Sequence, residues 1–118
     1  MQSLPHPYRA LVVGAHGALG AAFVQHLRGD AACERVVGAV RQPRGGDEVH
    51  LDLDDLSSIE QAGRDLQGQG PFHLLIDATG VLAVDGQPPE KRLADLDPVT
   101  MMRAFAINTI GPVMLLKH

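Results

Sequence analysis

The stretch RALVVGAHGALG at residues 9–20 joins a short apolar run to a glycine-rich turn, and it decides the fold. The apolar run is typical of a buried strand, so we predict a strand over 9–13. Apolar residues at helical spacing follow, which predicts a helix over 17–28, and the glycine at 29 is a common helix stop. A glycine turn between a strand and a helix is a setting in which proteins bind phosphate groups.

Each glycine of the turn GAHGALG (14–20) has its own physical reason. Gly14 permits the tight turn, Gly17 lets the backbone come close to a pyrophosphate, and Gly20 lets the helix lie against the sheet. The G-x-x-G-x-x-G spacing departs from the common G-x-G-x-x-G fingerprint, and the alternative interpretation is a tight turn with no ligand. We predict that a dinucleotide places its pyrophosphate over this turn, at Gly14, His16, Gly17, Ala18, Leu19 and Gly20.

The rest of the chain alternates strands and helices in a pattern typical of α/β proteins. Short apolar or alternating runs predict strands over 35–40, 48–52 and 72–78. Capping residues and helical periodicity predict a helix over 56–67, with a capping box at Ser57 and Glu60, and a final helix from Asp97 and Pro98 toward His118. A long loop occupies 81–96. We therefore predict a Rossmann-type parallel sheet in strand order 3-2-1-4, with helices on both faces.

Composition and charge exclude several classes of function. The 118 residues are 45% hydrophobic and 20% charged with a net charge of −4, which is typical of a soluble globular domain. The scarcity of aromatic residues and the negative charge argue against nucleic-acid binding, and the longest apolar run, about four residues, predicts no membrane span. Cys33 is the single cysteine, so we expect a cytoplasmic protein without an internal disulfide. The six histidines show no metal-ligand spacing, so we expect no metal site.

Four motifs occur in one order along the chain: GAHGALG at 14–20, LDL at 51–53, DATG at 77–80 and NTIGP at 108–112. Together they resemble the short-chain dehydrogenase/reductase superfamily, most closely its C-factor-like or carbonyl-reductase-like branch. The resemblance implies an NAD(P)-dependent oxidoreductase that acts on a carbonyl or alcohol group. It covers the first half of a typical member, so residues 1–118 are expected to be the N-terminal half of one NAD(P)-binding domain.

The resemblance also assigns cofactor contacts at two strand ends. It implies that Asp52 hydrogen-bonds the adenine amino group, with Leu53 beside the ring. It further implies that the cofactor ribose passes the DATG segment, at Ala78, Thr79 and Gly80. The other interpretation of Asp52 is an acidic residue at a helix start, where the positive end of the helix dipole favours it.

The choice of cofactor depends on the residues after the strand over 35–40. An acidic side chain near this point suits the ribose 2′-hydroxyl of NAD, whereas an arginine suits the 2′-phosphate of NADP. Arg41 directly follows the strand, and Arg44 and His16 add positive charge nearby. We predict NADP(H), with NAD as the alternative. The non-functional interpretation of Arg41 is a solvated arginine at a strand end.

The family's catalytic serine and its Tyr-x-x-x-Lys motif are absent from this chain. Its one tyrosine, Tyr8, precedes the first predicted strand, and its last serine is Ser58. The resemblance gives a catalytic role to Asn108 alone, as the residue that holds a helix kink and a water linked to the lysine. Asparagine is otherwise unfavoured inside a helix.

Two further hypotheses stay open beside the oxidoreductase: a non-catalytic nucleotide-binding or regulatory module, and an unstable truncated gene product. The sequence stops inside an apolar helix, which favours truncation. A truncated sheet would leave the strand over 72–78 and more than one face of the final helix uncovered. We therefore expect self-association through that helix, or partial unfolding, and no reductase turnover by the chain alone.

Overall fold

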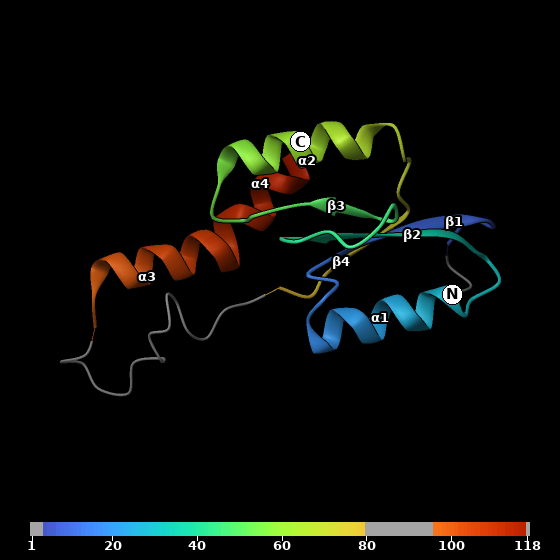
Figure 1. Ribbon diagram of the computed structural model, residues 1–118, viewed down its shortest axis with the longest axis horizontal. Coiled ribbons are helices and arrows are strands. Elements are labelled where there is room, and N and C mark those ends of the chain that lie inside the picture. The colour runs from blue at the N-terminus through green and yellow to red at the C-terminus, as the bar shows by residue number, and fades with distance from the viewer. Residues whose placement is uncertain (1–3, 80–95, 118) are drawn as a thin grey trace.

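The computed structural model describes residues 4–79 and 96–117. Its four strands are all parallel and lie in the order β3-β2-β1-β4 (Figure 1). This confirms the predicted α/β fold and strand order 3-2-1-4. The elements in chain order are β1 (Tyr8–Val13), α1 (Ala18–Arg28), β2 (Cys33–Val40), β3 (Glu48–His50), α2 (Leu56–Gln67), β4 (Leu74–Asp77), α3 (Pro98–Phe105), the π-helical segment η2 (Ala106–Ile110) and α4 (Gly111–Lys117).

Different helices cover the two faces of the sheet, as Figure 1 shows, with α2 and α4 above the strands and α1 below. Side chains alternate along each strand, so each strand contributes to both faces. The buried core on the α2 and α4 side contains Leu11, Val13, Val37, Ala39, Val49, Leu51, Leu53, Ile59, Ala62, Leu66 and Leu115. The buried core on the α1 side contains Tyr8, Ala10, Val12, Ala15, Leu27, Val36 and Val40.

Several boundaries differ from the sequence-based predictions. β1 and β2 begin earlier than predicted, at Tyr8 and Cys33, and those two residues pair across the strands. β3 and β4 are shorter than predicted. The predicted capping box at Ser57 is wrong: Asp55 is the N-cap of α2, and its Oδ1 accepts the Ser57 N–H at 3.0 Å. Both residue types cap helices well, so composition alone did not separate the two positions.

The predicted final helix is present but interrupted. Asp97 is its N-cap and accepts the Thr100 N–H, and Pro98 opens it, as predicted. The residues 106–110 then form a π-helical segment, after which α4 returns to the α2 side of the sheet. α3 projects beyond the strands (Figure 1), and Arg103 on it forms an ion pair with Asp54 at 2.8 Å. Most of the predicted loop over 81–96 lies outside the described residues.

The helical run exposes much apolar surface. It is 19 residues long over Pro98–Leu116, with a hydropathy of 1.4, which is long and apolar enough to cross a membrane by length and composition. A single helix of this kind does not by itself indicate a membrane span, so the prediction of no membrane span stays untested. The exposed large apolar residues of the run are Val99, Met101, Met102, Phe105, Ile110, Val113 and Leu116.

Candidate functional site

The glycine turn lies where β1, β2 and β4 end together. Gly14 has a φ of +80°, in the left-handed region, and its N–H donates to the Ala39 carbonyl of β2 at 2.9 Å. A Cβ on Gly14 would lie 2.8 Å from Thr79 Cγ2 and 3.2 Å from the Ala78 carbonyl. Both the backbone conformation and the lack of space therefore require glycine here, as predicted.

Gly20 brings α1 directly onto the turn. A Cβ at this position would lie 2.0 Å from the Gly14 carbonyl oxygen and 2.8 Å from its carbon. Gly17 is the N-cap of α1, and no side chain caps this helix end. A Cβ at Gly17 would meet the Gly14 oxygen at 3.5 Å, an ordinary contact, so packing within the protein does not require glycine there.

The first turn of α1 is consequently open to a ligand. His16, Gly17, Ala18 and Leu19 are exposed residues, and Leu19 keeps 62% of its surface. Backbone N–H groups at an uncapped helix start, together with the helix dipole, suit a phosphate group. The structure places these four residues on one exposed helix start, next to the half-buried Gly14 and the buried Gly20, and their contact with a pyrophosphate stays a prediction.

The end of β4 forms the opposite wall of this turn. The Ala78 N–H donates to the Val13 carbonyl at 2.9 Å, which continues the ladder between β4 and β1. The Asp77 carboxylate accepts hydrogen bonds from the Thr79 N–H, at 3.0 Å, and from the Thr79 hydroxyl. Ala78 and Thr79 are half-buried beside Gly14, so the structure unites both motifs. Gly80 lies outside the described residues.

Asp52 and Leu53 follow β3 and are engaged by the protein itself. Asp52 Oδ1 accepts the Asp54 N–H at 3.0 Å, which supports the turn into α2. Leu53 is 9% exposed within the core, and a Cβ on Gly111 of α4 would lie 2.6 Å from its carbonyl oxygen. Their predicted contacts with adenine stay predictions.

An acidic residue that the sequence analysis did not single out, Glu48, lies beside the basic residues His16 and Arg44. Arg41 is exposed directly after β2, as predicted. His16 is not a free positive group, because its Nε2 lies 2.6 Å from Glu48 Oε2. Glu48 Oε1 also accepts the Arg44 N–H at 2.6 Å. Partial burial alone would raise the pKa of Glu48, but the hydrogen bonds from Arg44 and His16 outweigh it and lower that pKa.

Sequence reasoning missed Glu48 because it lies far along the chain from the turn. The signal that could have found it is the parallel register, in which Glu48 pairs with Gly38 beside β1. A Cβ on Gly38 would lie 2.9 Å from Ala15 Cβ, so glycine at this position lets Ala15 of the turn lie close to β2.

Asn108 is exposed at the centre of η2, the segment Ala106–Ile110. The predicted irregularity of the helix at this residue is therefore present, while the catalytic role stays a prediction. Tyr8 is fully buried at the start of β1, the end opposite the glycine turn, and its hydroxyl donates to Asp30 Oδ2 at 2.6 Å. This hydrogen bond and burial raise the pKa of the Tyr8 hydroxyl.

Within residues 4–79 and 96–117, no cluster of three or more histidine, cysteine, aspartate or glutamate side chains could hold a metal ion.

No protein-family model and no curated protein matches the chain, whereas many solved structures do. NADPH-bound carbonyl reductase from chicken fatty liver matches with a TM-score of 0.78 and 22% identity, over 97% of this chain and 48% of that one. A short chain dehydrogenase from Burkholderia cenocepacia J2315 in complex with NADP matches at 0.74 and 21%, over 95% and 45%. A Brucella ovis oxidoreductase of the short chain dehydrogenase/reductase family, with a partially ordered NAD, matches at 0.72 and 22%, over 93% and 55%.

These likenesses establish the fold. The chain spans about half the length of the structures that it matches. Its Rossmann-type sheet and helices therefore correspond to about half of the fold of known short-chain dehydrogenases and carbonyl reductases.

Proposed function

We propose that the chain is the NADP(H)-binding half of a short-chain dehydrogenase/reductase that acts on a carbonyl or alcohol group. The observation that carries this proposal is the open turn 14–20, where β1, α1 and the end of β4 meet in a sheet of order 3-2-1-4. Three neighbours of the same fold bind NADPH, NADP or NAD, which supports a nicotinamide dinucleotide as the ligand.

The turn fits such a ligand by the space that its glycines leave. Side chains at Gly14 or Gly20 would fill the space between the turn, α1 and β4. The N–H groups at the start of α1 would hold the pyrophosphate, and the residues after β3 and β4, Asp52 and Ala78, would flank the adenine and the ribose. When bound, the nicotinamide would accept or donate the hydride, and the protein would supply binding and orientation.

The preference for NADP rests on Arg41. Its guanidinium follows β2 at the exposed end of the sheet, where a 2′-phosphate would pair with a fixed positive charge. Arg44 lies on the same connection between β2 and β3.

We propose that these 118 residues do not reduce a carbonyl by themselves. Their one tyrosine is buried against Asp30, and Asn108 alone carries a proposed catalytic role, through helix geometry and a bound water. The proposed cytoplasmic location rests on Cys33 alone, because a single cysteine cannot form an internal disulfide.

Calorimetric titration of the purified protein with NADPH and NADH tests the proposed cofactor. Gly14→Val should abolish binding of both, because a side chain is strained at a φ of +80° and meets Thr79 and Ala78. Gly45→Ala is the matched control, since a Cβ there meets nothing within 4 Å. Unchanged binding in Gly14→Val would contradict the proposal.

Arg41→Asp tests the preference for NADP in the same titration. It should weaken NADPH roughly tenfold or more while NADH changes little, because the lost contact serves the 2′-phosphate alone. An equal loss for both cofactors would refute the role of Arg41.

A further inference from the structure

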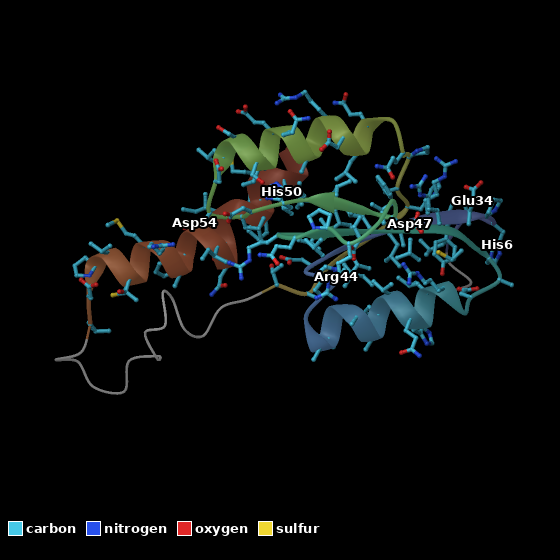
Figure 2. All side chains as sticks on the ribbon, viewed as in Figure 1. His6, Glu34, Arg44, Asp47, His50 and Asp54 are labelled. Atoms are coloured by element: carbon cyan, nitrogen blue, oxygen red, sulfur yellow. The ribbon has the colours of Figure 1, made fainter. Side chains whose placement is uncertain are left out.

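A hollow of about 310 Å³ lies between α1 and the connection of β2 to β3, and it begins at the glycine turn with Ala15 and His16. Parallel strands usually need a crossover of about a dozen or more residues, commonly a helix. Here residues 41–47 alone make the connection, and none of them is helical. The hollow is therefore lined by α1 on one side and by Arg44, Asp47 and Glu48, at the end of this short connection, on the other. Figure 2 labels Arg44 and Asp47 of this connection.

Glu48 places a fixed negative charge in this hollow. Its two carboxylate oxygens have separate partners, the His16 ring at 2.6 Å and the Arg44 N–H at 2.6 Å. The side chain is 18% exposed, and that of His16 is 26% exposed. Glu48 pairs with Gly38 of β2, and a Cβ on Gly38 would lie 3.6 Å from Glu48 Cγ, an ordinary contact.

The location of this carboxylate matters for the ribose of a dinucleotide. His16 belongs to the turn proposed to hold the pyrophosphate, so Glu48 lies one side chain away from that turn. In dinucleotide-binding folds, an acidic group near this point accepts a hydrogen bond from the 2′-hydroxyl of NAD. Such a residue normally comes from the end of the second strand. In this chain the acidic group is the Glu48 carboxylate, at the start of β3, whereas the residue that follows β2 is Arg41.

We propose that Glu48 is a specificity-determining residue for the adenosine ribose, which favours the 2′-hydroxyl of NAD(H) and opposes the 2′-phosphate of NADP(H). It does so by its negative charge and by holding His16 and the Arg44 N–H, two donors that a phosphate could use beside Arg41. Arg41 thus favours NADP(H), whereas Glu48 favours NAD(H). This proposal rests on the proposed function, because it concerns the ligand of the same turn.

The test is a calorimetric titration of the purified protein and its Glu48→Gln variant with NADPH and with NADH. Glutamine keeps an oxygen for the Arg44 N–H and removes the charge. The ratio of NADPH affinity to NADH affinity should rise roughly tenfold, since like charges placed together are strongly unfavourable. Glu60→Gln, an exposed residue of α2 on the opposite face, gives the same change of net charge as a control and should leave the ratio unchanged.

A second variant, Glu48→Ser, also removes the charge and serves if Glu48→Gln has a local folding defect. Circular dichroism should show a cooperative thermal unfolding transition for both variants. An unchanged ratio in the folded variants, with both cofactors still bound, would overturn the role of Glu48 and leave the proposed function intact. The same rise in Glu60→Gln would also overturn it, because net charge would then explain the effect. Binding of neither cofactor by the unaltered protein would refute both proposals.

Discussion

Five of the six residues of β1 are buried, whereas none of the eight residues of α3 is. The two regions are both apolar, but they differ in what surrounds them. β1 lies between β2 and β4 and has a helix layer on each face. The run from α3 to α4 enters the core through Leu115 and lies close to Leu53 at Gly111. An apolar sequence therefore indicates that burial would be favourable, and the neighbouring elements determine whether the residues are in fact buried.

The comparison also separates two kinds of glycine. Gly20 and Gly111 each have backbone atoms where a Cβ would stand, at 2.0 Å and 2.6 Å. The first lies between elements that are fixed on all sides. The second lies at the start of α4, which meets Leu53 there and reaches the core through Leu115. Substitutions at these two positions should therefore measure how rigid each region is.

Gly20→Ala should have the largest effect. The Cβ cannot be accommodated without moving the Gly14 turn, which the Ala39 carbonyl and β4 hold in place. We expect a loss of at least about 3 kcal/mol in the free energy of unfolding, or no folded protein, although alanine is the better helix former. Urea unfolding followed by circular dichroism measures it. Gly45→Ala should stay within about 0.5 kcal/mol of the unaltered chain, and an equally small change in Gly20→Ala would show that the turn yields.

Self-association should respond strongly to the exposed helix region. Met102 and Phe105 are 63% and 59% exposed and lie three residues apart on α3. We propose that the chain associates through this surface, so Met102→Glu combined with Phe105→Glu should remove most of the concentration dependence in sedimentation velocity.

Leu56→Glu is the control for that experiment, because Leu56 is 58% exposed but lies on α2. It should leave association unchanged. If the control dissociates the protein as well as the double variant does, or if the unaltered chain is a monomer at every concentration, the surface on α3 is not the interface.

Gly111→Ala should cost less than Gly20→Ala, about 1–2 kcal/mol, because α4 can shift away from the Leu53 carbonyl. NADPH binding should fall less than in Gly14→Val, because Gly111 contacts Leu53, a predicted adenine contact, and not the turn at 14–20. Urea unfolding measures the change in stability, and calorimetric titration with NADPH measures the change in cofactor binding. A loss equal to that of Gly20→Ala would mean that the two regions are equally rigid.

The smallest effect concerns the pH dependence of stability. The Tyr8 hydroxyl and the Ala32 N–H hold the pKa of Asp30 at about 2, below its usual value. A lowered folded-state pKa adds stability above the unfolded pKa, roughly 4, which is lost as the pH falls toward 2. Tyr8→Phe should therefore flatten the decline in unfolding free energy over this interval. Glu60→Gln serves as control, and an unchanged slope in Tyr8→Phe would remove the claimed link.

The fold was predictable because local and long-range signals agree around the turn. The strand, the positive φ at Gly14 and the close approach at Gly20 all follow from short-range chemistry. Asp97 and Pro98 predicted the start of α3 for the same reason.

Two kinds of feature could not be predicted: contacts that depend on the register of the strands, and positions where two residues suit the same role equally well. Glu48 reaches His16 through the pairing of β3 with β2, which no local pattern reveals. Asp55 and Ser57 were two good caps two residues apart, and the structure uses the earlier one. Leu19 has the spacing of a core residue, yet it lies on the exposed first turn of α1.

The π-helical segment Ala106–Ile110 changes the direction in which the side chains that follow it point around the helix axis. One extra residue in a turn rotates everything after it by about 100° relative to a continuous α-helix. Leu115, after this segment, reaches the core, whereas Met102 and Phe105, before it, are exposed on α3, which projects beyond the strands. Removing a single residue from 106–110 would therefore rotate α4, and Leu115 with it, by about 100° relative to α3.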